Sequence, residues 1–459
     1  MELMADTLSR PEHARAAAAV RIAHLGVGNF FRAHQAWYTD RAPDAADWGI
    51  AAFTGRRPAL AAALGPQQGL YTLVTRGPTT DQFDVIASVS AVHAATEHDA
   101  WLTYLRSPEL AIVTLTVTEA GYRCRSDASL DTTDDAVRAD VEALRADLTA
   151  PVATAPARVL AGLVARARAG HGPIAVVPCD NLPDNGAVVA GAVRAMAELV
   201  DPSLLDDLDR TASFVTTMVD RITPETTDDD RATVRNETGI DDAAPVVTEP
   251  FSEWVISGSF PAGRPRWEQA GATIVDDVAP FEQRKLRLLN GGHSLLAYAA
   301  SIRGHVTVAD AVADPVCRGW LDQWWDEAAA GLSLPAADIA AYRDALLERF
   351  ANPRIRHLLA QIAADGSAKL PVRILPTLRE QRGAGTVPPG AVRVLAAWIC
   401  HLRGHGAPVN DADGERARAA ASGPVADAVA AVLTMLDPAL GADDALAAAV
   451  ATRIEDLTR

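Results

Sequence analysis

The sequence predicts an α/β domain built on a doubly wound parallel sheet, followed by a mostly α-helical domain. Three observations support this prediction. The first part of the chain alternates short β-branched apolar runs with helical patterns, as expected where helices cover both faces of a parallel sheet. From about Asp276 onward these runs thin out, and helical patterns rich in Ala, Leu and Arg dominate. With 459 residues the chain also exceeds one typical domain, so we expect domains at 1–276 and 277–459.

Composition and charge narrow the classes of function. A net charge of −17 argues against binding to nucleic acid or to an anionic membrane, because both need a basic surface. No apolar run reaches the ~18 residues needed to span a bilayer. The four cysteines are scattered without a Cys-x-x-Cys pair, which favours a reducing compartment and gives no structural zinc site. We expect a cytoplasmic protein, a monomer or small homo-oligomer, whose partner is a small molecule.

The first strand is expected at 21–25, and it leads through Gly26-Val-Gly into a helix. This pattern is typical of a Rossmann-like dinucleotide-binding unit, where glycines let the backbone approach a pyrophosphate at a helix N-terminus. Phe31 stands where such units usually have a third glycine. A tight turn in a protein without a cofactor is the alternative. The candidate cofactor-binding residues of this turn are Gly26, Gly28, Asn29, Phe30 and Arg32.

The second strand is expected at 49–54, and its end bears on the choice of cofactor. An Asp or Glu there would bind the adenosine ribose of NAD, but the sequence has none. Thr54 and Arg56 occupy the region, and an arginine can pair with a 2′-phosphate. Both residues are therefore candidates for binding the cofactor, which is NAD with NADP as the alternative.

Two further buried strands are expected to end in polar residues. The run from Leu110 ends at Thr118 and Glu119, and the run from Ile174 leads into Cys179-Asp-Asn-Leu-Pro-Asp-Asn-Gly. Ligands of parallel sheets bind beyond the carboxyl ends of the strands, so Thr118 and Glu119 are candidate cofactor-binding residues. A solvated turn at Glu119, and simple turn chemistry in the Asx-rich loop, are the alternatives.

Other expectations concern local structure. We expect strands at 84–92 and from Ser213 to Pro224, and an exposed acidic excursion at 226–242. In the helical domain, residues 365–376 are expected to interrupt the helices, with Lys369 and Arg373 on either side of a proline.

The stretch 281–294 groups three functional side chains. On an ideal α-helix, with ~100° per residue, Lys285, Asn290 and His293 fall at roughly 0°, 140° and 80° and share a face. Gly291 and Gly292 remove bulk beside them, which indicates that something approaches the backbone closely. An amine, a carboxamide and an imidazole can thus converge on one small molecule. The alternative is a surface lysine, an asparagine near a helix end and a buried, hydrogen-bonded histidine.

Five motifs, in order along nearly the whole chain, resemble the mannitol dehydrogenase family of polyol-specific long-chain dehydrogenases. They are Gly26-Val-Gly-Asn-Phe-Phe-Arg-Ala-His, Thr118-Glu-Ala-Gly-Tyr, Cys179-Asp-Asn-Leu-Pro-x-Asn-Gly, Val219-Asp-Arg-Ile-Thr-Pro and Lys285-Leu-x-x-Leu-Asn-Gly-Gly-His-Ser. The resemblance implies zinc-independent hydride transfer between a nicotinamide cofactor and a polyol or ketose. It implies Lys285 as the catalytic base or acid, Asn181 and Asn290 as amide donors to the reacting oxygen, and His293 as a residue that positions the substrate.

Several substrates remain open within this resemblance. D-Mannitol and D-fructose are the leading pair. A hexuronate such as fructuronate is the next, because Lys369 and Arg373 could supply a fixed cation for a carboxylate. Mannitol 1-phosphate is a third candidate, and an inactive cofactor-binding protein is the alternative from another class. Asn181, Asn290, His293, Lys369 and Arg373 are the predicted substrate-binding residues.

The role implied for Lys285 requires a lowered pKa. A lysine can act as a base near neutral pH only where its pKa falls below the usual ~10.4.

Overall fold

The computed structural model describes residues 6–55 and 58–458. The chain forms two compact units, Met1–Ala279 and Pro280–Arg459. Among the described helices, none is long and apolar enough to cross a membrane.

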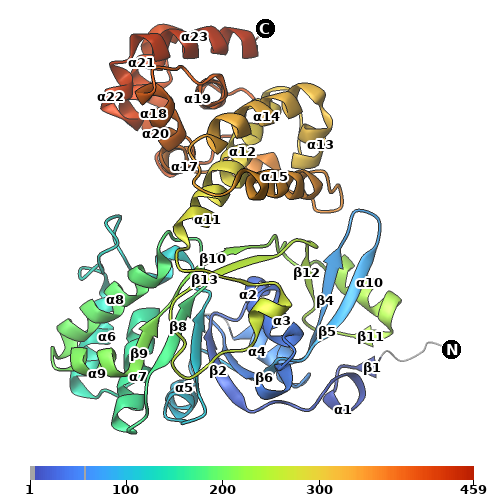
Figure 1. Cartoon of the computed structure of the whole chain (residues 1–459), viewed down its shortest axis with the longest axis vertical. Coiled ribbons are helices and arrows are strands. Elements are labelled where there is room, and N and C mark those ends of the chain that lie inside the picture. The colour runs from blue at the N-terminus through green and yellow to red at the C-terminus, as the bar shows by residue number, and fades with distance from the viewer. Residues whose placement is uncertain (1–5, 56–57, 459) are drawn as a thin grey trace. The chain divides into compact units, whose positions relative to one another are not determined.

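The first unit is built on a six-stranded parallel sheet with the strand order β6-β3-β2-β7-β8-β9 (Figure 1). The chain runs from β2 outward to β6 and then returns to β7 and runs outward the other way, which makes the sheet doubly wound. The predicted fold class is therefore confirmed. The six strands are β2 (Val20–Leu25), β3 (Gly49–Phe53), β6 (Val89–His93), β7 (Ile112–Leu115), β8 (Ile174–Pro178) and β9 (Ala212–Phe214).

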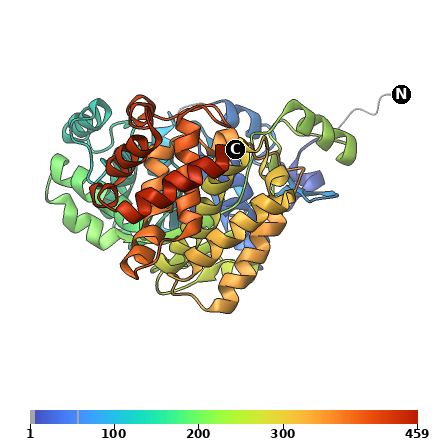
Figure 2. The same ribbon diagram turned by 90° about the horizontal axis from the view of Figure 1, so that it is seen from above.

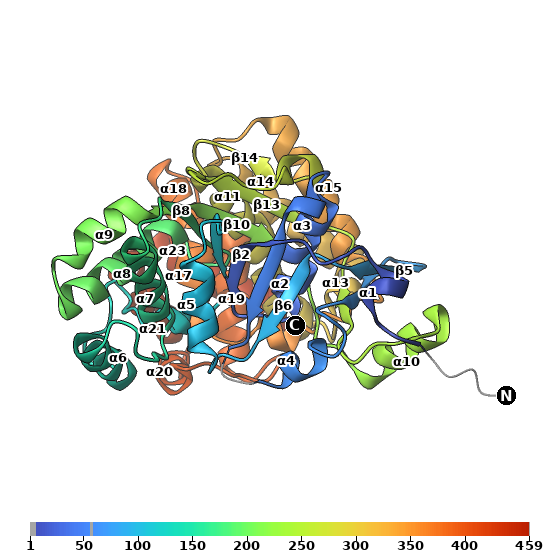
Figure 3. The ribbon, with the colours of Figure 1, turned by 90° about the horizontal axis from the view of Figure 1, so that it is seen from below.

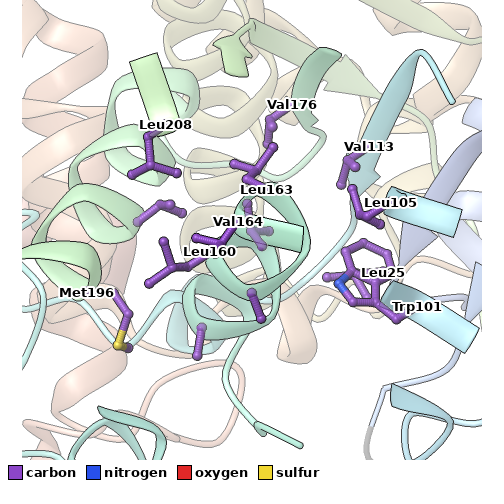
Figure 4. Close-up of a cluster of buried hydrophobic side chains, with 14 of the residues drawn as sticks. Leu25, Trp101, Leu105, Val113, Leu160, Leu163, Val164, Val176, Met196 and Leu208 are labelled. Atoms are coloured by element: carbon purple, nitrogen blue, oxygen red, sulfur yellow. The ribbon is translucent and has the colours of Figure 1, made fainter. Parts of the chain in front are cut away.

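Apolar side chains on both faces of this sheet explain why its strands are continuously hydrophobic. In β3, Ala51 and Phe53 belong to one core cluster, whereas Ile50 and Ala52 belong to the other. The first cluster includes Leu160, Leu163 and Val164 of one helix; in Figure 4 Val176 lies next to Leu163, and Leu25 lies beside Trp101. Its helices are α5 (His98–Leu105), α6 (Asp135–Ala146), α7 (Ala155–Arg168), α8 (Asn185–Val200) and α9 (Leu204–Thr211). On the other side lie α2 (Asn29–Ala33) and α3 (Gln35–Arg41), as Figure 3 shows.

Smaller sheets flank this core, and here the local predictions need correction. The predicted strand 84–92 is divided between β5 and β6, and the strand predicted from Ser213 to Pro224 is divided between β9 and β10; each pair lies in two different sheets. The strands outside the main sheet are β1 (Asp6–Thr7), β4 (Tyr71–Arg76), β5 (Asp81–Ile86), β10 (Thr216–Asp220), β11 (Ile240–Asp241), β12 (Val246–Thr248), β13 (Glu253–Ser257) and β14 (Thr273–Ile274). The remaining short helices are α1 (Arg10–His13), η1 (Ala45–Asp47), α4 (Ala59–Leu64), η2 (Glu119–Tyr122) and η3 (Trp267–Ala270).

The acidic segment predicted as an exposed excursion contains a helix, α10 (Asp228–Thr238). Thr227 and Asp230 form a capping box at its start, so acidic residues stabilise the N-terminus of this helix. Val234 is fully buried and fastens the helix to the unit.

The second unit is built from helices, which Figures 1 and 2 show in yellow to red. Its central segment comprises α11 (Ala279–Arg284), the π-helix η4 (Lys285–Asn290), α12 (Gly291–Leu295) and the π-helix η5 (Leu296–Ala300). Every residue from Gly291 to Ala300 is buried, so α12 and η5 lie in the core of this unit. The others are α13 (Val308–Ala313), α14 (Pro315–Ala329), α15 (Ala336–Phe350), α16 (Leu359–Ile362), α17 (Gly366–Arg373), α18 (Leu375–Gly383), α19 (Pro389–Leu402), α20 (Gly414–Ala420), α21 (Val425–Leu436), α22 (Pro438–Gly441) and α23 (Asp444–Thr458).

The predicted interruption at 365–376 was wrong, because most of it is the helix α17. Asp365 precedes this helix with a positive φ of 54°, and Pro371 lies inside it. Leu370 is fully buried and α17 packs against α12. This packing outweighs the poor helix propensity of glycine and proline in the segment.

Candidate active site

The glycine turn of the first unit brings the ends of β2 and β7 together. Gly26 has a φ of 106°, and a Cβ added there would lie 2.5 Å from the carbonyl oxygen of Thr116. The Thr116 hydroxyl donates a hydrogen bond to the Gly26 carbonyl at 2.8 Å. Only glycine fits this position, because any side chain would push the two strand ends apart.

His24 supports the turn from below, a role that motif reasoning missed. Its Nδ1 lies 2.8 Å from the Thr114 hydroxyl and its Nε2 lies 3.1 Å from the Thr116 hydroxyl. The imidazole stacks on Phe31, with ring centroids 3.6 Å apart. Burial lowers the pKa of His24 to about 3, so the ring is neutral. Phe31 therefore stands where the third glycine is usual and makes an aromatic contact with His24. The signal that could have identified His24 is a histidine within a mostly apolar strand.

A pocket of about 970 Å³ opens beyond the ends of β2, β3 and β7, entirely within the first unit. Three predicted cofactor-binding residues line it, namely Gly26, Thr54 and Thr118. The Thr54 hydroxyl accepts a hydrogen bond from the Ala95 amide at 3.0 Å, which joins the β3 end to the loop after β6. The volume and the glycine that leaves room for a close backbone approach fit a dinucleotide.

Other predicted cofactor-binding residues lie away from the lining of this pocket. Gly28 precedes the first residue of α2, Phe30 stacks on His34, and Asn29 donates to the Pro224 carbonyl at 3.2 Å. Glu119 is exposed at the start of η2. Arg56 lies outside the described residues.

Arg32 needs a correction, because the structure gives it a supporting position. It is buried and donates hydrogen bonds to the Ala244 carbonyl, to Asn29 Oδ1 at 2.7 Å and to the Gly28 carbonyl at 3.2 Å. These bonds use three of the five guanidinium N–H donors, and Arg32 is not among the residues that line the pocket, so we assign it to the support of the turn.

The loop after β8 is fixed by the neighbours of Asn181. Asp180 is buried and accepts hydrogen bonds from the Tyr122 hydroxyl at 2.5 Å and from the Leu182 amide at 2.9 Å. Burial raises the pKa of Asp180. Asn185 exchanges two hydrogen bonds with the Thr217 backbone, at 2.9 and 3.0 Å. Asn181 itself is exposed on this loop, so its predicted role stays a prediction.

In the second unit, Lys285 and Asn290 are the first and last residues of a π-helix. The α-helical geometry assumed from the sequence is therefore wrong for this segment. A π turn bonds residue i to i+5, so residues five apart lie nearer to one line along the helix than the ~140° of an α-helix allows. Single π turns are frequent at functional sites. The Asn290 carboxamide makes no hydrogen bond with the described residues, which leaves its donors available to a ligand.

Two tryptophans of α14 hold this π-helix. Trp324 Nε1 donates to the Arg287 carbonyl and Trp325 Nε1 donates to the Leu288 carbonyl, each at 2.9 Å. A Cβ on Gly291 would lie 2.6 Å from Trp324. The close approach predicted from the two glycines is therefore made by protein side chains and not by a ligand. Arg287 adds two hydrogen bonds of 2.6 Å to the Glu380 carboxylate.

His293 is buried with a neutral ring. It stacks on Phe350 with centroids 4.5 Å apart and lies edge-on to His357 at 4.8 Å. Burial, with the charges of His357, Arg349 and Arg373, lowers its pKa well below the usual value. Its buried Nε2 has no hydrogen-bond partner among the described residues. Such an atom is expected to find a partner when a ligand binds.

The helix α17 brings two further predicted residues into this unit's site. Arg373 Nη1 donates to the Ser294 hydroxyl at 3.3 Å, and Ser294 donates to the Asn290 carbonyl at 3.1 Å. Lys369 Nζ donates to the Ile362 carbonyl at 3.3 Å, and burial, with the charge of Arg373, lowers its pKa. Lys285 and Lys369 are the only lysines in a chain with 42 basic residues. That count was an available signal for amine chemistry at these positions.

A group of potential metal ligands lies elsewhere in the second unit, at His305, Asp314 and Cys317. Asp314 Oδ2 already pairs with Arg303 at 2.8 Å and with His305 at 3.0 Å. Its Oδ1 accepts from the Val316 amide at 2.8 Å and caps α14. We assign the group a structural role, because a guanidinium on the same carboxylate opposes a cation.

Comparisons with known proteins agree with this layout. Residues 20–269 match the mannitol dehydrogenase Rossmann domain, and residues 277–458 match the mannitol dehydrogenase C-terminal domain. The D-mannonate oxidoreductase of Escherichia coli (strain K12) is 37% identical over 408 residues, which cover 86% of this chain and 83% of that protein. The mannitol 2-dehydrogenase of Cereibacter sphaeroides is 37% identical over 410 residues, covering 87% and 84%. The Pseudomonas fluorescens mannitol 2-dehydrogenase, solved with NAD and D-mannitol, has a TM-score of 0.79 at 33% identity and covers 99% of this chain and 94% of its own.

Proposed function

This chain belongs to the mannitol dehydrogenase family, and we propose that it interconverts a polyol and a ketose, most concretely D-mannitol and D-fructose. As a member of the family it is an oxidoreductase acting on CH–OH donors, with NAD as its cofactor. The observation that supports the proposal most directly is the π-helix that begins at Lys285 and ends at Asn290.

The proposed reaction uses these side chains in distinct roles. NAD supplies a two-electron acceptor for the hydride that leaves the alcohol carbon. Lys285 Nζ takes the hydroxyl proton, and Asn290 donates a hydrogen bond to the same oxygen as negative charge develops. Asn181 is proposed as a second amide donor. His293 is neutral, so its Nε2 positions a substrate hydroxyl and takes no part in the proton balance.

The presence of only two lysines allows a sharp test of the base. In Lys285→Arg the positive charge is kept, but a guanidinium cannot give up its proton in proteins. We expect kcat to fall at least ~10²-fold, while the affinity for NADH measured by calorimetry stays unchanged. Lys369→Arg is the comparison variant: Lys369 is a predicted substrate-binding residue and not the base, so this change should alter KM for the substrate more than kcat. A Lys285→Arg enzyme with more than a tenth of the parent kcat would remove Lys285 from the proton transfer.

A second candidate substrate is a hexuronate, and the cations of α17 favour it. Arg373 and Arg349 lie close enough to lower the pKa of His293, so positive charge gathers around this ring. A relative named D-mannonate oxidoreductase is as similar as one named mannitol 2-dehydrogenase. A carboxylate would pair with Arg373 through two hydrogen bonds, worth ~1.5–3 kcal/mol. We place the polyol first because the net charge of −17 gives no general attraction for anions.

A substrate panel distinguishes the two candidates. Polyols, ketoses and hexuronates should each be assayed with NAD and with NADP. For a uronate, Arg373→Lys should lower kcat/KM roughly tenfold or more, since lysine cannot form the bidentate pair. For mannitol or fructose the same change should be nearly silent. A parent enzyme at least tenfold more efficient on fructuronate than on fructose would reverse our preference.

A further inference from the structure

We propose that Arg158 and His98 bind the adenine base of the dinucleotide. Both side chains line the pocket of the first unit, and neither belongs to the glycine turn or to the family motifs quoted above. The inference rests on NAD binding in this pocket and is independent of which alcohol reacts.

Arg158, on the first turns of α7, is a buried cation with two nitrogen atoms that lack a hydrogen-bond partner in the described part of the chain. Its side chain is 6% exposed, and its Nε and Nη2 have no partner among the described residues. The guanidinium lies over the rings of Phe53 and Trp101, 5.8 and 5.7 Å from their centroids. Burial lowers its pKa to about 10. Buried donors of this kind are normally satisfied, and a ligand is the missing partner.

His98, the first residue of α5, has the same property. It is 4% exposed, and both ring nitrogens are buried without a partner in the described part of the chain. Burial and the charge of Arg158 lower its pKa, so the ring is neutral. A neutral imidazole offers one N–H donor and one acceptor nitrogen.

The position of the two residues points to the adenosine half of the cofactor. In dinucleotide-binding sheets the adenosine ribose binds at the end of the second strand, which here is β3. Phe53 is the last residue of β3, and Arg158 lies over its ring. The pyrophosphate belongs at Gly26, on the neighbouring strand end.

The rest of the pocket wall suits a base better than a phosphate. Val117, Pro151, Val152 and Ala155 give it apolar surfaces that can contact the faces of a purine. Asp140 also lines the pocket, but its oxygens accept from the Ala153 amide and from the amide and hydroxyl of Thr154, at 2.7–2.9 Å. Arg158 therefore supplies donors for the ring nitrogens of adenine, and His98 supplies an acceptor for its amino group.

The test is direct binding of cofactors to the full-length protein by calorimetry. Arg158→Met keeps an unbranched chain against Phe53 and Trp101 but removes every donor. We expect the affinities for NADH and NADPH to fall by the same factor, roughly ten- to a hundredfold, as for a lost charged hydrogen bond. Reduced nicotinamide mononucleotide, which lacks the adenosine half, should bind as it does to the parent. Arg168→Met, which removes an exposed charge from the same helix, is the control and should bind NADH normally.

Each other outcome would overturn the proposal. A loss confined to NADPH would make Arg158 a 2′-phosphate ligand, and an equal loss for the mononucleotide would indicate a general structural effect. Unchanged NADH binding would exclude Arg158 from the site. If the variant does not fold, the affinity of the parent protein for a cofactor with an altered base gives a second test. Replacing the adenine amino group by an oxygen, as in nicotinamide hypoxanthine dinucleotide, should weaken binding at least about tenfold, and equal affinity would refute the assignment.

Discussion

Replacing Trp324 with Phe tests whether α14 fixes the π-helix that bears Lys285. The change keeps an aromatic ring beside Gly291 but removes the N–H that bonds to the Arg287 carbonyl at 2.9 Å. Trp324 is fully buried, so water cannot replace that donor. An unsatisfied buried acceptor costs about 1–3 kcal/mol, and the smaller ring adds a cavity cost of similar size. We expect a loss of stability of roughly 2–6 kcal/mol.

Activity should respond separately from cofactor binding in this variant. A relaxed π-helix misplaces Lys285 and Asn290, so kcat should fall about tenfold or more, the cost of ~1.4 kcal/mol in the barrier. NADH binding, which the first unit provides, should be unchanged by calorimetry. The matched control is Trp320→Phe on the same helix, whose ring packs on Arg303 and Arg393 and makes no such bond with the described residues. Denaturant unfolding and kcat that match those of the control would refute the reasoning.

Three other perturbations give distinct results. Gly291→Ala places a Cβ 2.6 Å from Trp324 and should lower kcat and destabilise the protein by about 1–3 kcal/mol, seen by thermal unfolding, whereas Gly319→Ala on α14, where nothing lies within 4 Å, should be tolerated. The pKa of His24 is lowered to about 3, so the unfolded chain takes up a proton first as the pH falls below ~6.5. The contribution of His24 to stability should be constant above that pH and should fall by about 2 kcal/mol by pH 5, which is measured as the difference in pH dependence between the parent and His24→Asn; equal pH dependence of the two would contradict the burial of His24. Exhaustive chelation should leave activity unchanged, because the proposed chemistry uses an amine and amides; loss with EDTA and recovery with zinc would overturn it.

Residues 281–294 show what a local sequence pattern can predict and what it cannot. Spacing on an ideal α-helix predicted that Lys285, Asn290 and His293 share a face, but Lys285–Asn290 is a π-helix, so the angles behind that prediction do not apply. The π geometry depends on Trp324 and Trp325, more than thirty residues further along the chain. A pattern of neighbouring residues contains no information about such partners, so the helix type and the reason for Gly291 could not be predicted.

Arg32 and Arg158 of the first unit show that the sequence does not predict which polar side chains become buried. Arg32 was predicted to bind cofactor because it follows the glycine turn, yet its donors are used by Asn29 and by backbone carbonyls. Arg158 gave no signal in the sequence, yet it is buried in the pocket lining, and its Nε and Nη2 have no hydrogen-bond partner among the described residues. Burial of a long polar side chain depends on what packs against its helix, and the sequence does not state this.

The sequence by itself determined the doubly wound sheet and the glycine turn, and it predicted the grouping of Lys285, Asn290 and His293. These follow from short-range rules: β-branched runs that are apolar on both faces, glycine where a side chain cannot fit, and helical spacing. Tertiary structure alone decided that α17 is helical despite Pro371, that Phe31 stacks on His24, and that the π-helix rests on α14. In each of these cases contacts between residues distant in sequence outweigh local propensity, because burial and satisfied hydrogen bonds contribute more free energy than the propensity of a single residue.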